Sequence, residues 1–510
     1  MEAGFDYDCI LIGSGLGALL CAAVLSKEGK RVLVLEKNEQ IGGSLQTFQR
    51  NGITYDTGVH YIGALDKGQT LHQIFNYVGI LDRLELQQLD GSAFDTILFG
   101  DDETAYPMAQ GYDGFIDGLS AQFPTQRDNL KQLCAEMKRT CAKFPLYQMM
   151  ADEQIDDLEI LQQPLRKTLE QFITDPKLIQ VLAGNNLLYA GCGEETPFYV
   201  YALILNSFIE SSWRCTAGGD QIAKLLARVI KANGGSIIRN AAVVKMVEEN
   251  ELLKYVELSN GKRFSAAQYI SNLHPQTTLE LLESDFIRPA FRSRIRKLKN
   301  TPGSFVVYAE LEPGKVSYTN RNYYYFDGPD VWKGGNYEIT QWPYQFGLFE
   351  MPPVSGDFTQ AVSIMTYMRW EEVEEWENSF NVSEMAGGRG AAYEEFKQEK
   401  AKLLLEKVKK KFPDLVANIR SFAVSTPLTY RDFLNYPEGG MYGIKKDFNE
   451  PVKTMISPNT RISNLFFTGQ NIKLHGILGV AISAMVTCNV MLGKEYLMEK
   501  LTIKPVKPHS

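Results

Sequence analysis

The amino-acid sequence predicts an α/β fold in which a discontinuous, Rossmann-like domain is joined to a mixed α+β domain. A strand, a glycine turn and a helix lie near the N-terminus, and two further blocks with glycines and strands lie near the middle and the C-terminus. A chain of 510 residues also exceeds the roughly 250–300 residues at which a single hydrophobic core stops growing. Two domains are therefore expected.

The composition is that of an ordinary globular enzyme, with 44% hydrophobic and 22% charged residues. A net charge of -8 disfavours a nucleic-acid partner, because phosphate binding requires a surplus of Lys and Arg on one face. The seven cysteines form no CxxC pair and no histidine stands at metal-ligand spacing, so free thiols and no metal site are expected. This pattern favours a reducing compartment, the cytoplasm.

Two apolar stretches could be mistaken for a signal peptide or a membrane span. Residues 9–25 follow Asp6 and Asp8, where a signal peptide would carry basic residues. Residues 474–492 include His, Ser, Thr and Asn, whereas a spanning helix needs about 20 nearly uninterrupted apolar residues. Both stretches are expected to belong to the fold, and no transmembrane segment is predicted.

The first block combines a strand, a glycine turn and a helix. An apolar run at residues 8–12 precedes the turn, and a helical pattern at residues 19–28 follows it. Gly13 permits the tight turn, Gly15 lets the backbone approach a pyrophosphate, and the small Ala18 lets helix and strand pack closely. The helix N-terminus favours phosphate. The dinucleotide contacts predicted in this turn are Gly13, Gly15, Leu16, Gly17 and Ala18.

The second strand of this unit, residues 31–36, ends on Glu36 about 20 residues after the glycine turn. A carboxylate at this place accepts hydrogen bonds from a ribose hydroxyl and repels a 2′-phosphate. The unit therefore favours FAD or NAD over NADP, with Glu36 and the adjoining Lys37 as cofactor contacts.

A second glycine pair indicates which of the two cofactors, a flavin or a nicotinamide dinucleotide, is bound. Gly42, Gly43 and Ser44 follow the acidic residue, and they resemble the extended FAD motif of glutathione-reductase-like flavoproteins. The resemblance implies that these residues bind FAD. Because only one glycine fingerprint is present, no separate NAD(P)H domain is expected, and the electron donor or acceptor stays open.

Four blocks together resemble the phytoene desaturase, carotenoid isomerase and retinol saturase group of FAD enzymes, and the saturase branch is the most similar. The blocks are the N-terminal fingerprint with its glycine pair, residues 55–63, residues 218–274 and residues 466–470. The resemblance covers most of the chain. It implies a glutathione-reductase-like FAD-binding domain assembled from residues 1–63, 215–288 and 426–500, and a substrate-binding domain made of residues 64–214 and 289–425.

The resemblance also implies individual cofactor contacts. Val244 would contact the adenine through its backbone, with an ordinary buried valine as the alternative, and His60 would lie against the flavin. In the C-terminal block, the N-terminus of a helix would stabilise the negative charge of reduced flavin. The contacts implied there are Gly469, Gln470, Gly476, Ile477 and Leu478.

The C-terminal region departs from the usual pattern of the group at one position and contains a loop with two possible interpretations. The group usually carries an acidic residue after the strand, where Gln470 and Asn471 stand here, and Asn471 is expected to reach the ribityl chain. The loop at residues 439–443 is either a flavin contact or a plain turn.

The second domain is expected to be a mixed α+β lid. In its first part, the sequence predicts helices at residues 112–122 and 126–141. In its second part, the sequence predicts strands at residues 304–311, 322–326 and 361–368 and a helix at residues 393–412. Nine aromatic residues could line an apolar tunnel or form ordinary core: Phe198, Tyr199, Tyr201, Phe208, Trp213, Tyr323, Tyr324, Tyr325 and Phe326.

The function implied by the resemblance is hydride transfer at a C=C or CH–CH bond of a hydrophobic polyene, carotenoid-like or retinoid-like. His60 and Tyr61 are the candidate catalytic residues for the accompanying proton, because histidine titrates near neutral pH. A structural role is the alternative for both, and His475 is a third candidate. The exact substrate, the direction of reaction and the oligomeric state stay open.

Two other functions share this architecture. An FAD amine oxidase would act on an amine, and a non-catalytic lipid carrier resembling Rab GDP-dissociation inhibitors would bind prenylated proteins. The complete fingerprint and Glu36 argue against the carrier. The charged helix at residues 394–411 is either a solvated face or a contact for anionic lipid, so peripheral membrane contact is a further hypothesis.

Overall fold

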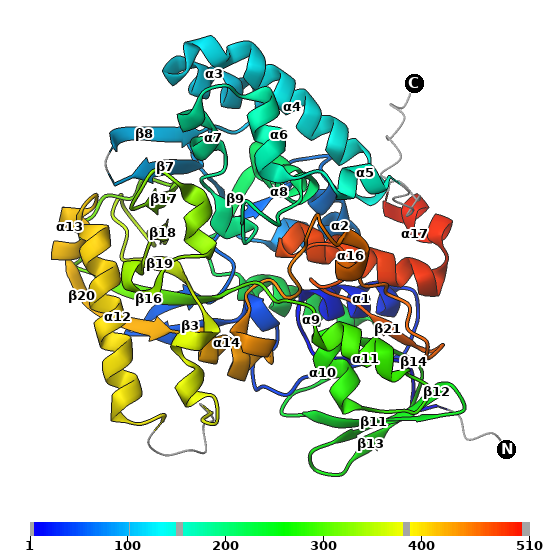
Figure 1. Ribbon diagram of the computed structural model, residues 1–510. Helices are drawn as coiled ribbons and strands as arrows, with labels where there is room; N and C mark the ends of the chain where they lie inside the picture. The colour runs from blue at the N-terminus through cyan, green and yellow to red at the C-terminus, as the bar shows by residue number, and fades with distance from the viewer. Residues whose placement is uncertain (1–4, 101, 149–156, 381–387, 502–510) are drawn as a thin grey trace.

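The computed structural model describes residues 5–100, 102–148, 157–380 and 388–501, and Figure 1 shows their arrangement. A five-stranded parallel sheet with the order β10-β2-β1-β14-β21 lies near the N-terminus. Its strands are β1 (Tyr7–Ile12), β2 (Val32–Leu35), β10 (Ser236–Ile238), β14 (Ala266–Ser271) and β21 (Leu465–Phe467). All five come from the three stretches predicted to form the FAD-binding domain.

Helices cover one face of this sheet, and a second sheet covers most of the other. Both faces are therefore buried, which explains the continuous apolar runs of the central strands. Helix α1 (Leu16–Lys27) is buried along almost its whole length, because it packs between α9 (Asp220–Ala232) and α16 (Gly476–Leu492). It begins at Leu16, earlier than the predicted residue 19, since the end of the glycine turn already has helical backbone.

A second, four-stranded sheet flanks the parallel one, in the order β13-β12-β11-β15. Its strands are β11 (Val243–Glu249), β12 (Leu252–Leu258), β13 (Arg263–Phe264) and β15 (Leu282–Glu283). Two small sheets follow: β3 (Thr47–Arg50) with β4 (Ile53–Asp56), and β5 (Ile62–Gly63) with β9 (Ser212–Cys215) and β6 (Leu86–Gln88). The domain boundary predicted between residues 214 and 215 thus falls within β9.

A seven-stranded sheet, in the order β20-β16-β19-β18-β17-β7-β8, supports the rest of the molecule. Its strands are β7 (Asp95–Phe99), β8 (Asp102–Met108), β16 (Gly303–Leu311), β17 (Asn322–Phe326), β18 (Gln345–Glu350), β19 (Ala361–Met368) and β20 (Ile419–Ser425). The strands predicted at 304–311, 322–326 and 361–368 are present. Strand β7 pairs in parallel with β17, so the first insertion contributes strands as well as the predicted helices.

The remaining helices surround these sheets. They are α2 (Thr70–Val78), α3 (Tyr112–Gln122), α4 (Arg127–Ala142), α5 (Leu158–Leu161), α6 (Leu165–Phe172), α7 (Pro176–Leu182), α8 (Phe198–Glu210), α10 (Pro275–Leu281), α11 (Pro289–Arg296), α12 (Ala391–Lys409), α13 (Pro413–Ala417), α14 (Pro427–Leu434), α15 (Pro451–Thr454) and α17 (Lys494–Leu501). Among the described residues, no helix combines the length and apolar character needed to cross a membrane.

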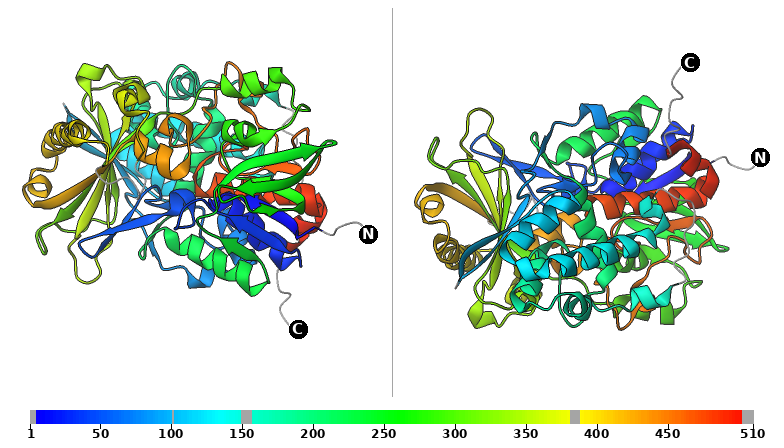
Figure 2. Two further views of the ribbon diagram at one scale, coloured as in Figure 1. Left: turned by 90° about the horizontal axis from the view of Figure 1, so that it is seen from below. Right: turned by 90° about the horizontal axis from the view of Figure 1, so that it is seen from above.

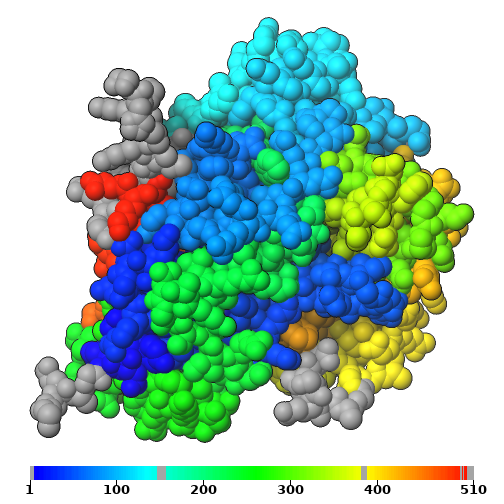
Figure 3. All heavy atoms as spheres, turned by 180° about the vertical axis from the view of Figure 1, so that it is seen from behind, coloured from blue at the N-terminus to red at the C-terminus, as the bar shows by residue number. Residues whose placement is uncertain are grey.

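The parallel sheet and the seven-stranded sheet lie at opposite ends of the molecule, as both views in Figure 2 show. Helices α3 and α4 form a separate layer beside them, which makes the cyan upper surface in Figure 3. One large core cluster fills the region of the seven-stranded sheet, and two smaller ones lie on the faces of the parallel sheet. This arrangement leaves a cavity between the two parts.

Helix α12 and the two residues that follow it carry the lysines for which lipid contact was a hypothesis. Several of them form ion pairs with carboxylates of the same chain: Lys397 with Glu394, Lys400 with Glu372, Lys407 and Lys410 with Asp327, and Lys411 with Glu103. These contacts favour the solvated, structural interpretation of the helix. Peripheral membrane contact stays a prediction.

Candidate functional site

One cavity of about 1530 Å³, measured out to its open mouth, joins the glycine turn to the second domain. We call the part at the glycine turn the cofactor end and the part in the second domain the substrate end. The residues that line the cofactor end are Gly15, Leu16, Gly17, Gly42, Ser44, Asn272, Gly469, Gln470, Asn471, Gly476, Ile477 and Leu478. The sequence motifs at both ends of the chain therefore meet in one place.

Glycines create the space at the cofactor end. A Cβ atom added at Gly17 would lie 2.6 Å from Asn272 Oδ1 and 3.0 Å from the backbone of Gly469. A Cβ atom at Gly15 would lie 2.5 Å from Asn272 Nδ2, and one at Gly43 would lie 3.1 Å from the Gly15 Cα. Any larger residue would collide with these atoms, so glycine is required at these positions, and the backbone of the turn lines the cavity without side chains over it.

Two buried polar atoms at this end have no hydrogen-bond partner, Asn272 Oδ1 and Gln470 Nε2. An unsatisfied buried polar group costs about 1–3 kcal/mol, so such groups indicate a ligand that pairs with them. Asn272 directly follows strand β14 and was not among the predicted contacts. A polar residue at the carboxyl end of a central parallel strand is the signal that could have identified it.

Two helix N-termini face the same space. Helix α1 begins after Gly15 and α16 begins after His475, and residues of both first turns line the cavity. Neither N-terminus has a side-chain cap, so free N–H groups and the positive ends of two helix dipoles are available to negative charge. A pyrophosphate at α1 and the electron-rich end of a flavin at α16 suit these positions.

Glu36 is buried and holds the glycine turn in place. Its carboxylate accepts hydrogen bonds from the Ser14 amide at 2.9 Å and hydroxyl at 2.5 Å, and from the Asn38 amide at 2.8 Å. The Ser14 carbonyl in turn accepts from the amide of Gly42, which ties the first glycine turn to the second. A structural role of Glu36 is thus visible, and its contact with a ribose stays a prediction.

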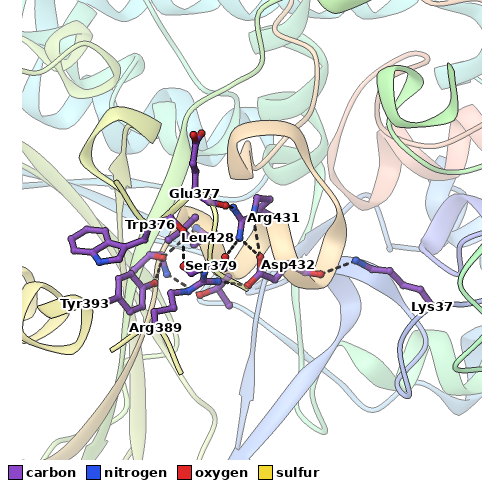
Figure 4. A network of polar contacts seen from close by, with 11 residues as sticks. Lys37, Trp376, Glu377, Ser379, Arg389, Tyr393, Leu428, Arg431 and Asp432 are labelled. Carbon is purple, nitrogen blue, oxygen red and sulfur yellow. Dashed lines mark hydrogen bonds and ion pairs between the residues drawn. The ribbon is translucent and has the colours of Figure 1, made fainter. Parts of the chain in front are cut away.

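Lys37 donates to the backbone carbonyl of Asp432 at 2.7 Å, and burial lowers the pKa of its ammonium. Figure 4 shows that this contact belongs to a wider network around helix α14. Within it, Arg389 and Asp432 form an ion pair whose side chains are each 3% exposed, and Arg431 bonds to the Ser379 carbonyl. Lys37 therefore joins the end of β2 to α14, and a direct cofactor contact stays a prediction.

Val244 does not line the cavity. It sits at a bulge of β11 between Val243 and Lys245, and its side chain is 48% exposed, so the alternative of an ordinary buried valine is wrong. A bulge leaves backbone groups outside the strand ladder. The backbone of Val244 is therefore accessible, and its contact with adenine stays a prediction.

The substrate end is lined by aromatic and aliphatic side chains from distant segments. Its lining residues are Tyr61, Tyr147, Leu187, Leu188, Leu203, Ile204, Phe208, Tyr324, Phe349, Met365, Tyr430, Tyr436, Met441 and Tyr442. Among the described residues, none that lines the cavity is Asp, Glu, Lys or Arg. Of the nine aromatic residues considered above, Phe208 and Tyr324 line the cavity, and the others are core or lie elsewhere.

His60 stacks on Phe349 with ring centroids 4.2 Å apart and an angle of 5°. Burial, and to a smaller extent the charge of Arg214, lowers the pKa of His60 to about 3. The inference from an ordinary histidine pKa is therefore wrong, because this imidazole is neutral throughout the physiological range. His60 and Phe349 also line a second, smaller pocket that reaches Arg214 and Val354, so the stacked pair forms a wall between two spaces.

Tyr61 is buried, and its hydroxyl lies 2.9 Å from Asp95 Oδ2 and 2.7 Å from the hydroxyl of Tyr324. Asp95 was not among the predicted residues, since a single acidic residue at the start of a strand gives no functional signal. The structure thus brings an ionisable carboxyl into contact with the predicted Tyr61.

His475 precedes α16 and its ring stacks on Tyr442 at 4.1 Å. Its Nε2 lies 2.8 Å from the Leu188 carbonyl, so this nitrogen carries the proton, and burial lowers the pKa of the ring to about 4. Asn471 Oδ1 accepts from the Ile444 amide at 2.9 Å. Both side chains therefore hold the loop at residues 439–444 against the cavity, and Met441 and Tyr442 of this loop line it.

A model of flavin-containing amine oxidoreductases matches residues 19–491. The chain belongs to this family. Its cofactor is accordingly FAD, which the glycine-lined end, the two free helix N-termini and the unpaired Asn272 and Gln470 atoms fit. These residues and Gly469 would hold it.

Curated relatives confirm the resemblance that the motifs indicated. All-trans-retinol 13,14-reductase of Homo sapiens is 26% identical over 539 residues, which cover 95% of this chain and 85% of the relative. Prolycopene isomerase of Arabidopsis thaliana is 24% identical over 516 residues, which cover 97% and 84%. Both relatives thus align with nearly the whole chain.

Solved structures confirm the predicted fold class. An oxidoreductase from Methanosarcina mazei aligns with a TM-score of 0.66 at 18% identity, over 95% of this chain and 99% of that chain. Putrescine oxidase bound to putrescine aligns with a TM-score of 0.64 at 13% identity, over 95% and 99%. A fatty acid isomerase from P. acnes aligns with a TM-score of 0.60 at 13% identity, over 96% and 99%.

Proposed function

We propose that this flavoprotein oxidoreductase acts on C=C or CH–CH bonds of a hydrophobic polyene, either carotenoid-like or retinoid-like. The observation that carries the proposal is the absence of charged side chains among the described residues that line the cavity. Burial of apolar surface contributes about 25 cal/mol per Å², so a long apolar chain would bind this surface well. A charged substrate would lose its hydration and find no partner.

The names of the relatives support a polyene. A retinol reductase and a prolycopene isomerase are named for conjugated substrates of the kind proposed. Saturation, desaturation and isomerisation would all use the same placement of a polyene beside the cofactor. The direction of reaction depends on the electron partner, which stays open.

When bound, FAD supplies hydride acceptance and donation at its isoalloxazine ring. The chain's own residues provide the rest. Phe208, Phe349 and Met365 exclude water and position an apolar chain. The first turn of α16 stabilises negative charge at the adjacent cofactor.

An amine oxidase is the second candidate, because the family description names amines. A protonated amine needs a carboxylate or a cage of carbonyls and aromatic faces to replace its hydration. The tyrosines of the substrate end could supply part of such a cage, but no carboxylate lines it among the described residues. The lipid carrier is disfavoured, since the family and the glycine-lined end both indicate a flavin.

The test starts from purified protein containing FAD, identified by its yellow absorption spectrum. The flavin is reduced with dithionite without oxygen and mixed with all-trans-retinol, with prolycopene and, as the rival substrate, with putrescine. We expect a polyene to re-oxidise the flavin and putrescine to leave it reduced. In the opposite direction, oxidised protein that putrescine reduces while dihydro-polyenes do not would replace the proposal by the amine oxidase.

A further inference from the structure

A chain of three buried polar side chains begins in β7 and ends at the substrate end of the cavity. Asp95 of β7 has no solvent exposure, and its Oδ2 lies 2.9 Å from the Tyr61 hydroxyl. The Tyr61 hydroxyl lies 2.7 Å from that of Tyr324 on β17. Both tyrosines line the cavity, whereas Asp95 does not.

The neighbours of Asp95 fix which of its oxygens can carry a proton. Arg214 donates from Nη2 to Asn322 Oδ1 at 2.6 Å, and a guanidinium has no acceptor. The Asn322 amide is therefore oriented with Nδ2 towards Asp95, and it donates to Oδ1 at 3.0 Å. Oδ1 is thus an acceptor, and a proton on Oδ2 faces the Tyr61 hydroxyl, which can accept it.

Burial raises the pKa of Asp95 to about 7, against the lowering effects of Asn322, Tyr61, Asn185 and Arg214. The ionisable groups that face it are Tyr61, Tyr324 and Arg214, and burial raises the pKa of both tyrosines well above the ordinary value. Asp95 can therefore gain and lose a proton near neutral pH, while the two phenols stay neutral and pass it on.

We propose that Asp95, Tyr61 and Tyr324 form a proton relay, with Tyr324 donating to or accepting from a substrate carbon; the relay rests on the proposed action on C=C or CH–CH bonds. Protonated Asp95 donates to Tyr61, Tyr61 donates to Tyr324, and the Tyr324 hydroxyl hydrogen is left to point into the cavity. After the transfer the two hydrogen bonds, Asp95–Tyr61 and Tyr61–Tyr324, have reversed direction. Asp95 is then the proton reservoir, and Tyr324 is the catalytic residue.

The step balances for saturation of a C=C bond. One carbon receives a hydride from the reduced flavin, and the adjacent carbon takes the Tyr324 proton. Tyr324 takes the proton of Tyr61 and Tyr61 takes that of Asp95, which becomes a carboxylate. The C=C bond has then gained two hydrogens and one electron pair has left the flavin. Desaturation runs these transfers in reverse and leaves Asp95 protonated.

Infrared spectroscopy tests the relay without any substrate. In FAD-loaded protein, the carboxylic-acid C=O stretch of Asp95 should be present at pH 5 and disappear as the pH rises through neutrality. The band should be absent in Asp95→Asn, shifted in Tyr61→Phe and in Tyr324→Phe, and unchanged in Tyr201→Phe. Tyr201 is a matched control, because it is a buried tyrosine that bonds to the Leu182 carbonyl outside the cavity.

Anaerobic re-oxidation of dithionite-reduced protein by all-trans-retinol, or by prolycopene where retinol does not react, tests the transfer itself. We expect Asp95→Asn and Tyr324→Phe to lower the maximal rate about 100-fold, the usual range for general acid catalysis. Half-saturation and FAD content should be retained, and Tyr201→Phe should react as wild type. The wild-type rate should also fall in D2O.

Two results would overturn the relay: a Tyr324→Phe variant with the wild-type rate, or an Asp95 carboxyl that is ionised throughout the pH range. A wild-type protein that no polyene re-oxidises, no dihydro-polyene reduces and that isomerises no polyene would instead reject the proposed function. In that case the infrared titration and its Tyr324→Phe shift decide alone whether the hydrogen-bonded chain exists.

Discussion

The cofactor end of the cavity is built mainly from backbone, whereas its substrate end is built from side chains. At the cofactor end, glycines and helix N-termini from three stretches of chain leave peptide groups open to a ligand. At the substrate end, large apolar residues from many separated segments set the shape. The first design binds one fixed ligand through invariant peptide geometry, and the second can change its substrate through single side chains.

The largest effect is expected from a side chain added at the cofactor end. In Gly17→Val the new Cβ would lie 2.6 Å from Asn272 Oδ1 and 3.0 Å from the Gly469 backbone. We expect FAD affinity to fall roughly 1,000-fold, equivalent to ~4 kcal/mol, as measured by flavin fluorescence titration. Gly118→Val is the matched control, since nothing lies within 4 Å of a Cβ at that helical glycine.

Retention of wild-type FAD affinity by Gly17→Val would show that the cofactor end does not depend on open backbone. The cofactor end would then not differ from the substrate end in the way described above. A similar loss in Gly118→Val would instead attribute the effect to general destabilisation.

This backbone end is the part that the sequence predicts well. Gly15, Gly17 and Gly469 are identifiable because the phosphate site needs fixed spacing and small residues within a short stretch of chain. Asn272 was not predicted, because its position at the cofactor end depends on the order of strands in the sheet. Lys37 was assigned by proximity to Glu36, but its partner is Asp432, almost 400 residues away along the chain.

The second effect concerns the apolar character of the substrate end. Ile204→Asp places a carboxylate where a polyene would lie, and we expect the rate of flavin re-oxidation at low polyene concentration to fall about 100-fold because the charge must be buried. FAD content should be retained. The control is Ile339→Asp, the same change at an isoleucine that is 50% exposed.

If Ile204→Asp kept its activity with polyenes, the apolar wall would not be the substrate site. If the variant gained activity with putrescine, the charge at this position would be shown to select the substrate class. Either result would concern the substrate end alone, because the cofactor end is unchanged in this variant.

The substrate end was predicted only in outline. Strands and helices such as β17 and α3 were expected at the observed residues, because their apolar periodicity is local. Most of the cavity lining was not predicted. Leu187, Phe349 and Met365 are apolar residues like those of the core, and they differ only because they face the cavity. Asp95 illustrates the same limit, because its raised pKa results from burial between β17 and β8.

The third effect is a pH dependence of stability that belongs to the substrate end. The pKa of Asp95 is about 7 in the folded protein and about 4 in an unfolded chain, so the folded state holds a proton that the unfolded state releases. Its stabilising contribution is complete below about pH 4 and is lost as the pH rises through 7. Between pH 5 and 7 wild type should lose about 2 kcal/mol from this group.

Chemical denaturation of FAD-loaded wild type and Asp95→Asn at both pH values measures this difference. The buried Asp56, whose pKa burial also raises to about 7, titrates in both proteins and cancels in the comparison. Equal pH dependence in the two proteins would contradict a protonated Asp95 and weaken the proposed relay with it.

The smallest expected effect is at His60, between the two ends. Because its pKa is about 3, no ionisation of this ring is available between pH 5 and 9. His60→Phe keeps a flat ring on Phe349, and we expect its pH profile of polyene-dependent re-oxidation to match wild type. His60→Ala removes the stacked wall towards the second pocket and should raise half-saturation without moving the profile. A limb near pH 6 that disappears in His60→Phe would restore His60 as the proton-handling residue and displace Tyr324.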